Sequence, residues 1–401
     1  MKRAERSVFE FLALNRNITL LLLAIILIGS GEEMWMRFVP KYLEALGAAP
    51  FLIGLFDALK TLLGALYAYP GGVVVDRWGH RRAFVAFTGL SLAGYSAMLL
   101  THRPAGVILA MFLFLAWTNL SLPATFSLVA ASLPAGKHTM GIGIQSLIKR
   151  LPIVIGPVAG GMLMDRLGLV SGVRAGISIS ILLTGSSIFL QRAIRDTAFT
   201  ASPARSNVVR VLRSFPTALR RLLWSDILIR FCERLPFAWV VIYALNQKGM
   251  TATKVGILIA VEMGAAIACY VPTAYLADRF GKEPFVVVTF VFFTLFPLLL
   301  AAAHSFRLLV LAFAVRGLKE FGEPARKSLI LSYAPPDHRG QAVGAYYLVR
   351  DTVVSLGSFA GAALWNLGPT INFRTAAALG AAGTVVYVFT LRTGATKPAM
   401  S

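Results

Sequence analysis

The sequence predicts an all-α polytopic membrane protein, and three observations support that prediction. The chain of 401 residues is 57% hydrophobic and 14% charged, whereas soluble domains carry about 25% charged residues. Apolar runs of about 20 residues, the length that spans a bilayer as a helix, recur from end to end. The two halves of the chain also repeat each other in sequence.

Six membrane-spanning helices are expected in the first half. The first apolar run follows a basic segment, but it is too long for a cleavable signal peptide and has no small-residue cleavage site. The second and third runs flank the polar segment YPGGVVVDRWGHRR, and the fifth run contains GPVAGG. The expected ranges are 17–42, 51–75, 82–101, 105–132, 141–163 and 169–190.

A further six helices are expected after the longest connection. Their ranges are 222–246, 252–277, 284–303, 307–331, 341–364 and 374–392. The chain therefore divides into an N-terminal six-helix bundle (1–190), a basic linker (191–221) and a C-terminal six-helix bundle (222–401).

The net charge of +21 is explained by the orientation of the helices. With both termini in the cytoplasm, most loop Lys and Arg residues fall on the inner side, as the positive-inside rule requires. The linker alone contributes Arg192, Arg195, Arg205, Arg210, Arg213, Arg220 and Arg221. A nucleic-acid partner is therefore not expected.

The internal repeat has an offset of 201 to 202 residues. The segment 69–82 matches VPTAYLADRFGKEP (271–284), and 141–161 aligns with 342–362. Parallel repeats of this kind enclose a cavity near the bilayer midplane in transporters.

The polar segment after the second helix identifies a family resemblance. Its defined positions fit the pattern G-x-x-x-D-R/K-x-G-x-R/K-R/K at Gly72, Asp76, Arg77, Gly79, Arg81 and Arg82. A partial copy stands at Asp278-Arg279. This pattern resembles the signature loop of the major facilitator superfamily. The resemblance implies two rocking bundles and a conformational latch at this loop; the alternative is a basic anchor on the inner side.

The fifth helix contains a second match. Gly156, Pro157, Gly160 and Gly161 resemble the Gly-Pro-x-x-Gly-Gly signature of antiporters in this family. Glycines permit close helix approach, and proline removes a backbone hydrogen bond, so a kinked helix is expected. The chain departs from the antiporter pattern at Pro152, and a generic packing face of small residues is the alternative.

Ionisable residues inside the expected spans are the main candidates for function. A lipid-facing charge costs about 3 kcal/mol, so these side chains should face a cavity, pair with one another or snorkel. The candidates are Glu32, Glu33, Arg37, Asp57, Lys60, Lys149, Arg150, Arg230, Glu233, Arg234, Glu262, Arg316, Lys319, Glu320, Glu323, Arg326, Lys327, Arg350 and Asp351.

Helical spacing predicts several pairs among them, so self-neutralising ladders are the structural alternative to a binding site. The predicted pairs are Glu33–Arg37, Asp57–Lys60, Arg316–Glu320, Lys319–Glu323 and Glu323–Lys327. Glu32 lies about 100° from Glu33 around the helix and has no such partner, which makes it the better candidate for ion coupling.

Carboxylates are the expected proton carriers. The five histidines (His80, His102, His138, His304 and His338) all fall in expected loops. The best carriers are Glu32 or Glu33, Glu233, Glu262 and Glu320. Sodium coupling would use the same carboxylates.

We therefore expect a secondary active transporter that works by alternating access, with proton-coupled export of a polar, charged or amphiphilic organic solute. The first alternative is proton- or sodium-coupled uptake of an organic anion or nutrient, and a non-transporting receptor is a further one. No enzyme motif, metal-binding spacing or cofactor site is found, and the two cysteines give no disulfide framework. A monomer in the inner membrane of a prokaryote is expected.

Overall fold

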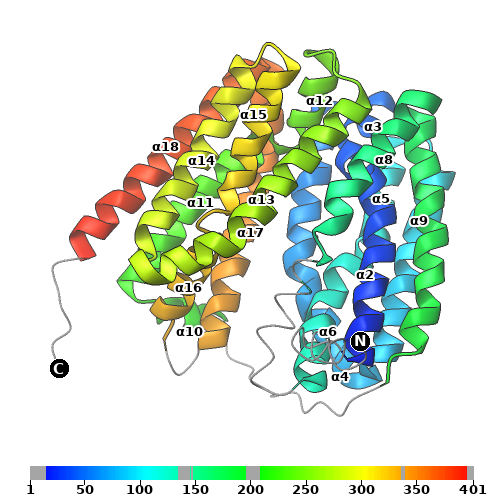
Figure 1. The fold of residues 1–401 in the computed structure, drawn as a ribbon, viewed down its shortest axis with the longest axis horizontal. Coiled ribbons are helices and arrows are strands. Elements are labelled where there is room, and N and C mark those ends of the chain that lie inside the picture. Colours follow the sequence, from blue (N-terminus) through cyan, green and yellow to red (C-terminus); the bar gives the residue numbers. More distant parts are fainter. Residues whose placement is uncertain (1–14, 134–144, 146–147, 196–207, 336–338, 395–401) are drawn as a thin grey trace, which may run out of the picture. The chain divides into compact units, whose positions relative to one another are not determined.

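The computed structural model describes residues 15–133, 145, 148–195, 208–335 and 339–394, and in this part every regular element is a helix (Figure 1). The all-α prediction is therefore confirmed. Seven of the described helical segments are long and apolar enough to cross a membrane. The start of the expected helix 141–163 lies largely outside the described residues.

The helices of the first half begin and end close to the expected positions. They are α2 (Arg16–Trp35), the 3-10 turn η1 (Met36–Phe38), α3 (Val39–Ala45), α4 (Pro50–Leu100), α5 (Pro104–Phe114), α6 (Ala116–Ser132), α8 (Leu151–Leu167) and α9 (Leu169–Arg192). The Asn15 side chain caps α2 by accepting a hydrogen bond from the Ile18 amide at 2.9 Å.

The helices of the second half follow the same plan. They are α10 (Val208–Arg213), α11 (Thr217–Phe237), α12 (Trp239–Asn246), α13 (Ala252–Phe280), α14 (Glu283–Ala302), α15 (Phe306–Gly317), the 3-10 turn η3 (Leu318–Glu320), α16 (Glu323–Tyr333), α17 (Arg339–Leu367) and α18 (Pro369–Gly394). Four expected helices are thus interrupted: 17–42 at η1, 105–132 at Leu115, 222–246 at Ala238 and 307–331 at η3.

Backbone conformation repeats between the halves. The glycines with positive φ are, in pairs, Gly47 and Gly249, Gly79 and Gly281, and Gly168 and Gly368. The members of each pair stand 200 to 202 residues apart. At Gly79 (φ 76°, ψ 165°) the long element α4 changes direction, so α4 contains both helices expected at 51–75 and 82–101.

The chain forms two compact units. Unit 1 comprises Met1–Ala48, Leu63–Pro203 and Thr251–Ala260; unit 2 comprises Ala49–Leu62, Ala204–Met250 and Val261–Ser401. In unit 1, α2 packs against α8 and α9. In unit 2, α11 packs against α17 and α18, and α14 packs against α18. The start of α4 thus clusters with unit 2, and the start of α13 clusters with unit 1.

The start of α13 is fixed to α8 inside unit 1. The Asp165 carboxylate accepts hydrogen bonds from the amides of Ala252 and Thr253 at 2.8 and 2.9 Å. These amides are orphan donors of the helix N-terminus, so Asp165 satisfies them from a different helix.

Candidate functional site

A pocket in unit 1 collects the expected charges of the first half. It encloses about 600 Å³, counted with its opening to solvent. The lining residues are Ile25, Ile28, Gly29, Glu32, Glu33, Trp117, Thr118, Ser121, Leu122, Thr125, Gln145, Lys149, Pro152 and Ile153. An apolar frame with a few convergent polar groups is typical of a small-molecule site.

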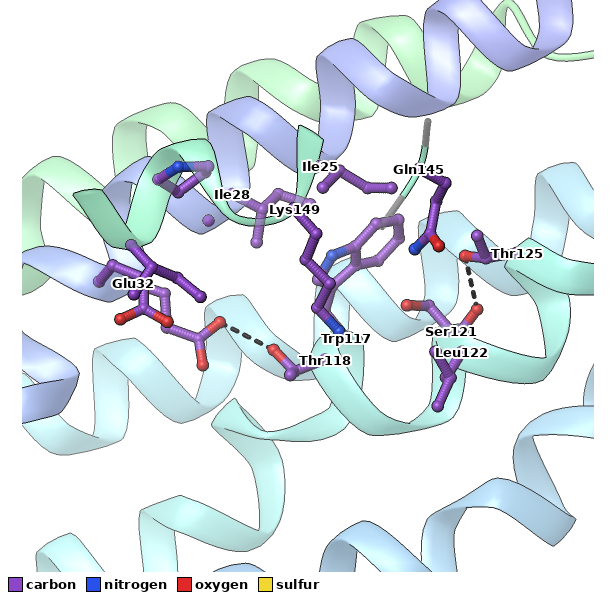
Figure 2. Close-up of a pocket in the computed structure, with 14 residues that line it drawn as sticks. Ile25, Ile28, Glu32, Trp117, Thr118, Ser121, Leu122, Thr125, Gln145 and Lys149 are labelled. Atoms are coloured by element: carbon purple, nitrogen blue, oxygen red, sulfur yellow. Dashed lines mark hydrogen bonds between the residues drawn. The ribbon is translucent and has the colours of Figure 1, made fainter. Parts of the chain in front are cut away.

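Glu32 and Lys149 are the charged centre of this pocket. The Thr118 hydroxyl donates a hydrogen bond to Glu32 Oε2 at 2.8 Å, and Glu32 is only 7% exposed. Figure 2 shows the Lys149 side chain reaching into the pocket, toward the helix that carries Trp117 and Thr118. The site thus offers an ammonium, a carboxylate and neutral hydrogen-bonding groups to a solute.

Glu33 has a different role from its neighbour. Arg37 Nε donates to Glu33 Oε2 at 3.3 Å, which is the i,i+4 pair that the sequence predicts. This ion pair joins Glu33 near the end of α2 to Arg37 in η1, so the Glu33 carboxylate already has a cationic partner.

Small residues on α8 allow this part of α2 to lie close to it. A Cβ added at Gly156 would lie 2.7 Å from Glu33 Cβ, and one at Gly160 would lie 1.7 Å from the Met34 carbonyl oxygen. Any larger residue at Gly160 would push the two helices apart. The glycine pattern of the fifth helix therefore positions α8 against the charged part of α2.

Unit 2 contains a buried charge cluster. It comprises Asp226, Arg230, Glu233, Glu262, Arg316, Lys319, Glu323, Arg326 and Arg350. Removing these ions from water costs several kcal/mol each, and only mutual pairing and hydrogen bonds offset that cost.

Asp226 on α11 is the most buried carboxylate of the cluster, with 0% exposure. It binds Arg326, accepts a hydrogen bond from the Tyr346 hydroxyl at 3.1 Å, and lies 3.4 Å from Arg350 Nη1. Sequence reasoning missed Asp226, which stands near the start of the expected helix 222–246. Its i,i+4 spacing to Arg230, with 3.8 Å between their charged atoms, is the signal that could have found it.

A second part of the cluster joins α11 to α13 and η3. Lys319 Nζ lies 2.8 Å from Glu233 and 3.1 Å from Glu262, and Arg316 Nε lies 3.2 Å from Glu262. The Arg316 guanidinium also lies over the Phe296 ring, 4.8 Å from its centroid.

Two of the predicted pairs are wrong, and the break at η3 explains why. Arg316 binds Glu262 instead of Glu320, and Lys319 binds Glu233 and Glu262 instead of Glu323. The i,i+4 rule requires a continuous helix, but α15 ends at Gly317 and α16 begins only at Glu323. Within α16 the rule holds: Lys327 Nζ lies 3.6 Å from Glu323.

Asp57 has other partners than the predicted Lys60. Arg234 Nη1 lies 3.2 Å from Asp57 Oδ1, and the Ser358 hydroxyl donates to Oδ2 at 2.6 Å. All three residues lie in unit 2. Arg350 also contacts its chain neighbour Asp351 at 2.7 Å.

The remaining predicted residues are not among the residues that line the unit 1 pocket or form the ion pairs of the unit 2 cluster. Lys60 lies on α4, Arg150 is the N-cap residue of α8, and Glu320 ends η3. The acidic and basic residues of the signature loop and of its copy are exposed: Asp76, Arg77, Arg81, Arg82, Asp278 and Arg279. His80 is a correction: it lies within α4, is 2% exposed, and its Nε2 lies 2.5 Å from the Ser127 hydroxyl.

Comparison with known proteins supports the same fold. The family model of the Major Facilitator Superfamily matches residues 21–261 and 222–400. An uncharacterized MFS-type transporter of Methanocaldococcus jannaschii is 23% identical over 333 residues, covering 80% of this chain and 83% of the relative. The multidrug resistance protein MdtH of Yersinia enterocolitica is 25% identical over 341 residues, covering 83% of this chain and 82% of that protein.

A solved structure shares the fold at low sequence identity. A POT family transporter in complex with 5-aminolevulinic acid has a TM-score of 0.80 and 14% identity, covering 95% of this chain and 97% of that chain. The family model, matched over nearly the whole chain, shows that this protein belongs to the major facilitator superfamily and is a multi-pass membrane transporter of small molecules, not an enzyme.

Proposed function

We propose that this transporter works by alternating access and couples proton movement to the export of a polar, charged or amphiphilic organic solute. The observation that carries the proposal is the unit 1 pocket, where Glu32 and Lys149 face the same space. A solute with groups of both signs, or with an anionic group and an apolar body, would match this lining. In unit 2 the charged residues pair with one another, so their role in this proposal is to stabilise the unit and not to bind the solute.

Glu32 is the proposed proton carrier. It lies in the pocket with Lys149 and accepts a hydrogen bond from the Thr118 hydroxyl at 2.8 Å. A proton on Glu32 would remove the negative charge beside Lys149, so protonation and solute binding would influence each other. Glu33 is less suited because it already pairs with Arg37.

The proposed direction rests on the Gly-Pro-x-x-Gly-Gly segment and on relatives named multidrug resistance proteins. Uptake of an organic anion or nutrient, with proton or sodium coupling, is the second candidate. It is favoured by Lys149 in the pocket and by the structural similarity to a transporter in complex with 5-aminolevulinic acid, an amino acid.

The proposal includes the architecture expected from the sequence. Two six-helix halves (1–190 and 222–401) are joined by the basic linker, with both termini on the cytoplasmic side of a prokaryotic inner membrane. The protein acts as a monomer. The exposed Asp76 and the basic residues after it would latch one conformation of the moving halves.

The first experiment is a thermal-shift screen of the purified protein against metabolites and drugs at two pH values. A stabilising compound is then loaded into proteoliposomes, and its proton-driven transport is compared in Glu32→Gln and Glu44→Gln. Glu44 pairs with Lys41 outside the pocket and serves as the control. We expect Glu32→Gln to abolish proton-driven transport while Glu44→Gln retains it. Equal transport by both variants would refute the role of Glu32.

A further inference from the structure

Unit 2 contains a second, smaller pocket between α11, α14 and the 3-10 turn η3. Its lining includes Glu233, Phe292, Phe293, Phe296, Arg316 and Lys319. It encloses about 260 Å³ with its opening to solvent, which is less than half of the unit 1 pocket. Pockets for drug-sized ligands enclose about 300–1,000 Å³, so this one suits a small ion or molecule.

Arg316, at the end of α15, is a buried cation of this pocket whose N–H groups lack acceptors. It is 7% exposed, and its Nε lies 3.2 Å from a Glu262 carboxylate oxygen. Beyond this ion pair, its guanidinium makes no hydrogen bond to any residue that the structure describes. A guanidinium has five N–H donors, and leaving buried charged donors without acceptors is unfavourable. The N–H groups of Arg316 therefore require an acceptor that the described residues do not supply.

Three phenylalanine rings surround the Arg316 guanidinium. Its central carbon lies 4.8 Å from the Phe296 centroid and 5.7 Å from the centroids of Phe237 and Phe313. The rings contribute cation–π attraction, but they carry no lone pair for an N–H group. Because Arg316 lines the pocket, the pocket is the space from which an acceptor can reach these donors.

Lys319 supplies a further donor to the same pocket. Its Nζ lies 2.8 Å from Glu233 and 3.1 Å from Glu262. An ammonium has three N–H donors, so two are used and one remains for a ligand. Arg316 Nε and Lys319 Nζ both contact Oε1 of Glu262, which brings the two cations close enough for one small ligand to reach both.

The unit 2 cluster has one more cation than it has carboxylates. Its cations are Arg230, Arg316, Lys319, Arg326 and Arg350, and its carboxylates are Asp226, Glu233, Glu262 and Glu323. Lys327 and Asp351, which pair with its rim, add one charge of each sign. Glu320 follows Lys319 in η3 and has its contacts outside this set of ion pairs. A water molecule could accept from Arg316 but would leave the excess charge, whereas one anion would balance it.

We propose that this pocket binds a single small monovalent anion, such as chloride or formate, between the Arg316 guanidinium and the Lys319 ammonium. Hydrogen bonds from charged donors to an anion are short and strong, and the phenylalanine wall strengthens them by lowering the local dielectric. The Glu233 carboxylate lines the same pocket and would repel a second negative charge, so a divalent anion such as sulfate is not expected. The site lies in unit 2, so this inference does not depend on the solute or on Glu32.

The position of the ion can be tested with bromide, which resembles chloride and scatters X-rays anomalously. The full-length native protein is crystallised in sodium bromide. We expect an anomalous difference peak within hydrogen-bonding distance of the Arg316 guanidinium. A map without a peak at that position would overturn the proposal.

The role of Arg316 can be tested through thermal stability. Sodium chloride replaces sodium gluconate at constant ionic strength, with the purified protein in detergent micelles; gluconate is too large for the pocket. A ligand of the folded state raises the melting temperature, so the melting temperature of the native protein should rise with chloride. In Arg316→Gln the same rise should require at least about tenfold more chloride, because a hydrogen bond from a charged donor is lost.

Arg307→Gln is the matched control. Arg307 stands on the same helix, α15, but its side chain is exposed and lies outside the pocket lining. Its chloride response should equal that of the native protein. If Arg316→Gln does not fold, Arg316→Lys carries the test, because it keeps a cation beside Glu262 but lacks the planar edge of the guanidinium.

The outcomes decide both the site and the charge of its ligand. A chloride response that is absent in the native protein, or that is equal in the native protein and the Arg316 variant, would overturn the site. Sodium sulfate at the same ionic strength should give no such response; a response as strong as that to chloride would overturn the assignment of a monovalent anion.

Discussion

Replacing Asp226 by Asn should destabilise the protein, because Asp226 is the carboxylate on which three arginines of the unit 2 cluster converge. The substitution keeps the shape of the side chain and removes one negative charge. Asp226 is 0% exposed and faces Arg326, Arg350 at 3.4 Å and Arg230 at 3.8 Å. Breaking a buried ion pair by removing one partner costs about 3–5 kcal/mol, because the other charge stays buried without compensation.

The expected loss lies in the lower part of that range. Glu323 remains as a second acceptor for Arg326, with 2.8 Å between Glu323 Oε2 and Arg326 Nη2. Asn also keeps an oxygen that can accept from the Tyr346 hydroxyl. We therefore expect the free energy of unfolding to fall by about 3 kcal/mol. The assay is a denaturant titration of the purified protein in detergent micelles, followed by tryptophan fluorescence.

Asp351→Asn is the control for this experiment. Asp351 contacts Arg350 at 2.7 Å, but its side chain is 30% exposed, so solvent screens the pair. A pair of this kind contributes about 0–1 kcal/mol. If Asp226→Asn lowered the free energy of unfolding no more than Asp351→Asn does, the ion pairs of Asp226 would not be what stabilises the unit 2 cluster.

Three further predictions test positions that the fold depends on. Gly160→Ala should lower the free energy of unfolding by more than about 2 kcal/mol, because its Cβ would overlap the Met34 carbonyl oxygen at 1.7 Å. Gly185→Ala, in the interior of α9 with nothing within 4 Å, should not lower it in the same titration. Gly79→Ala should cost about 1–3 kcal/mol because φ is 76°; an unchanged value would argue against this backbone conformation. Asp57→Asn should cost about 3 kcal/mol, because Asp57 is buried and the half-buried Arg234 would lose its carboxylate; unfolding as in the native protein would show that the pair contributes little.

The fold was predictable because its signals are long and repeated. Apolar runs, positive loops and an offset of about 202 residues each use many positions, so single errors do not matter. The helix interruptions were not predictable in the same way. At η3 the sequence carries a boundary signal that the prediction did not use, because Gly322 precedes α16 and Pro324 stands in its first turn. The packed structure adds contacts that hold the chain there. A Cβ at Gly317 would lie 2.2 Å from the Glu262 carbonyl oxygen, and the Gly322 amide binds the Thr289 hydroxyl.

The candidate sites show the same limit. Pairing within one helix could be predicted from spacing, as for Glu323–Lys327 in α16, because the geometry is local. Pairing between helices, as for Lys319 with Glu233 and Glu262, depends on how helices pack, which spacing does not encode. The buried polar face of α9 (Ser180, Thr184, Ser187 and Gln191) was missed for a further reason: serine and threonine are common in membrane helices and carry no charge, so they stand out only when their burial is known.

The two groups of buried carboxylates differ in how firmly they are held, and this difference predicts which of them can carry a proton. Glu262 lies 3.1 Å from Lys319 and 3.2 Å from Arg316, so a proton on it would leave two cations with less compensating charge. Glu32 accepts a 2.8 Å hydrogen bond from the Thr118 hydroxyl and shares with Lys149 a pocket that opens to solvent, so water can compensate for a change in its charge. Glu262→Gln should therefore lower the free energy of unfolding by about 3 kcal/mol, and Glu32→Gln by less than about 1 kcal/mol. Denaturant titrations of both variants at the same pH check this, and an equal or larger loss in Glu32→Gln would mean that Glu32 is a structural charge whose protonation the fold does not tolerate.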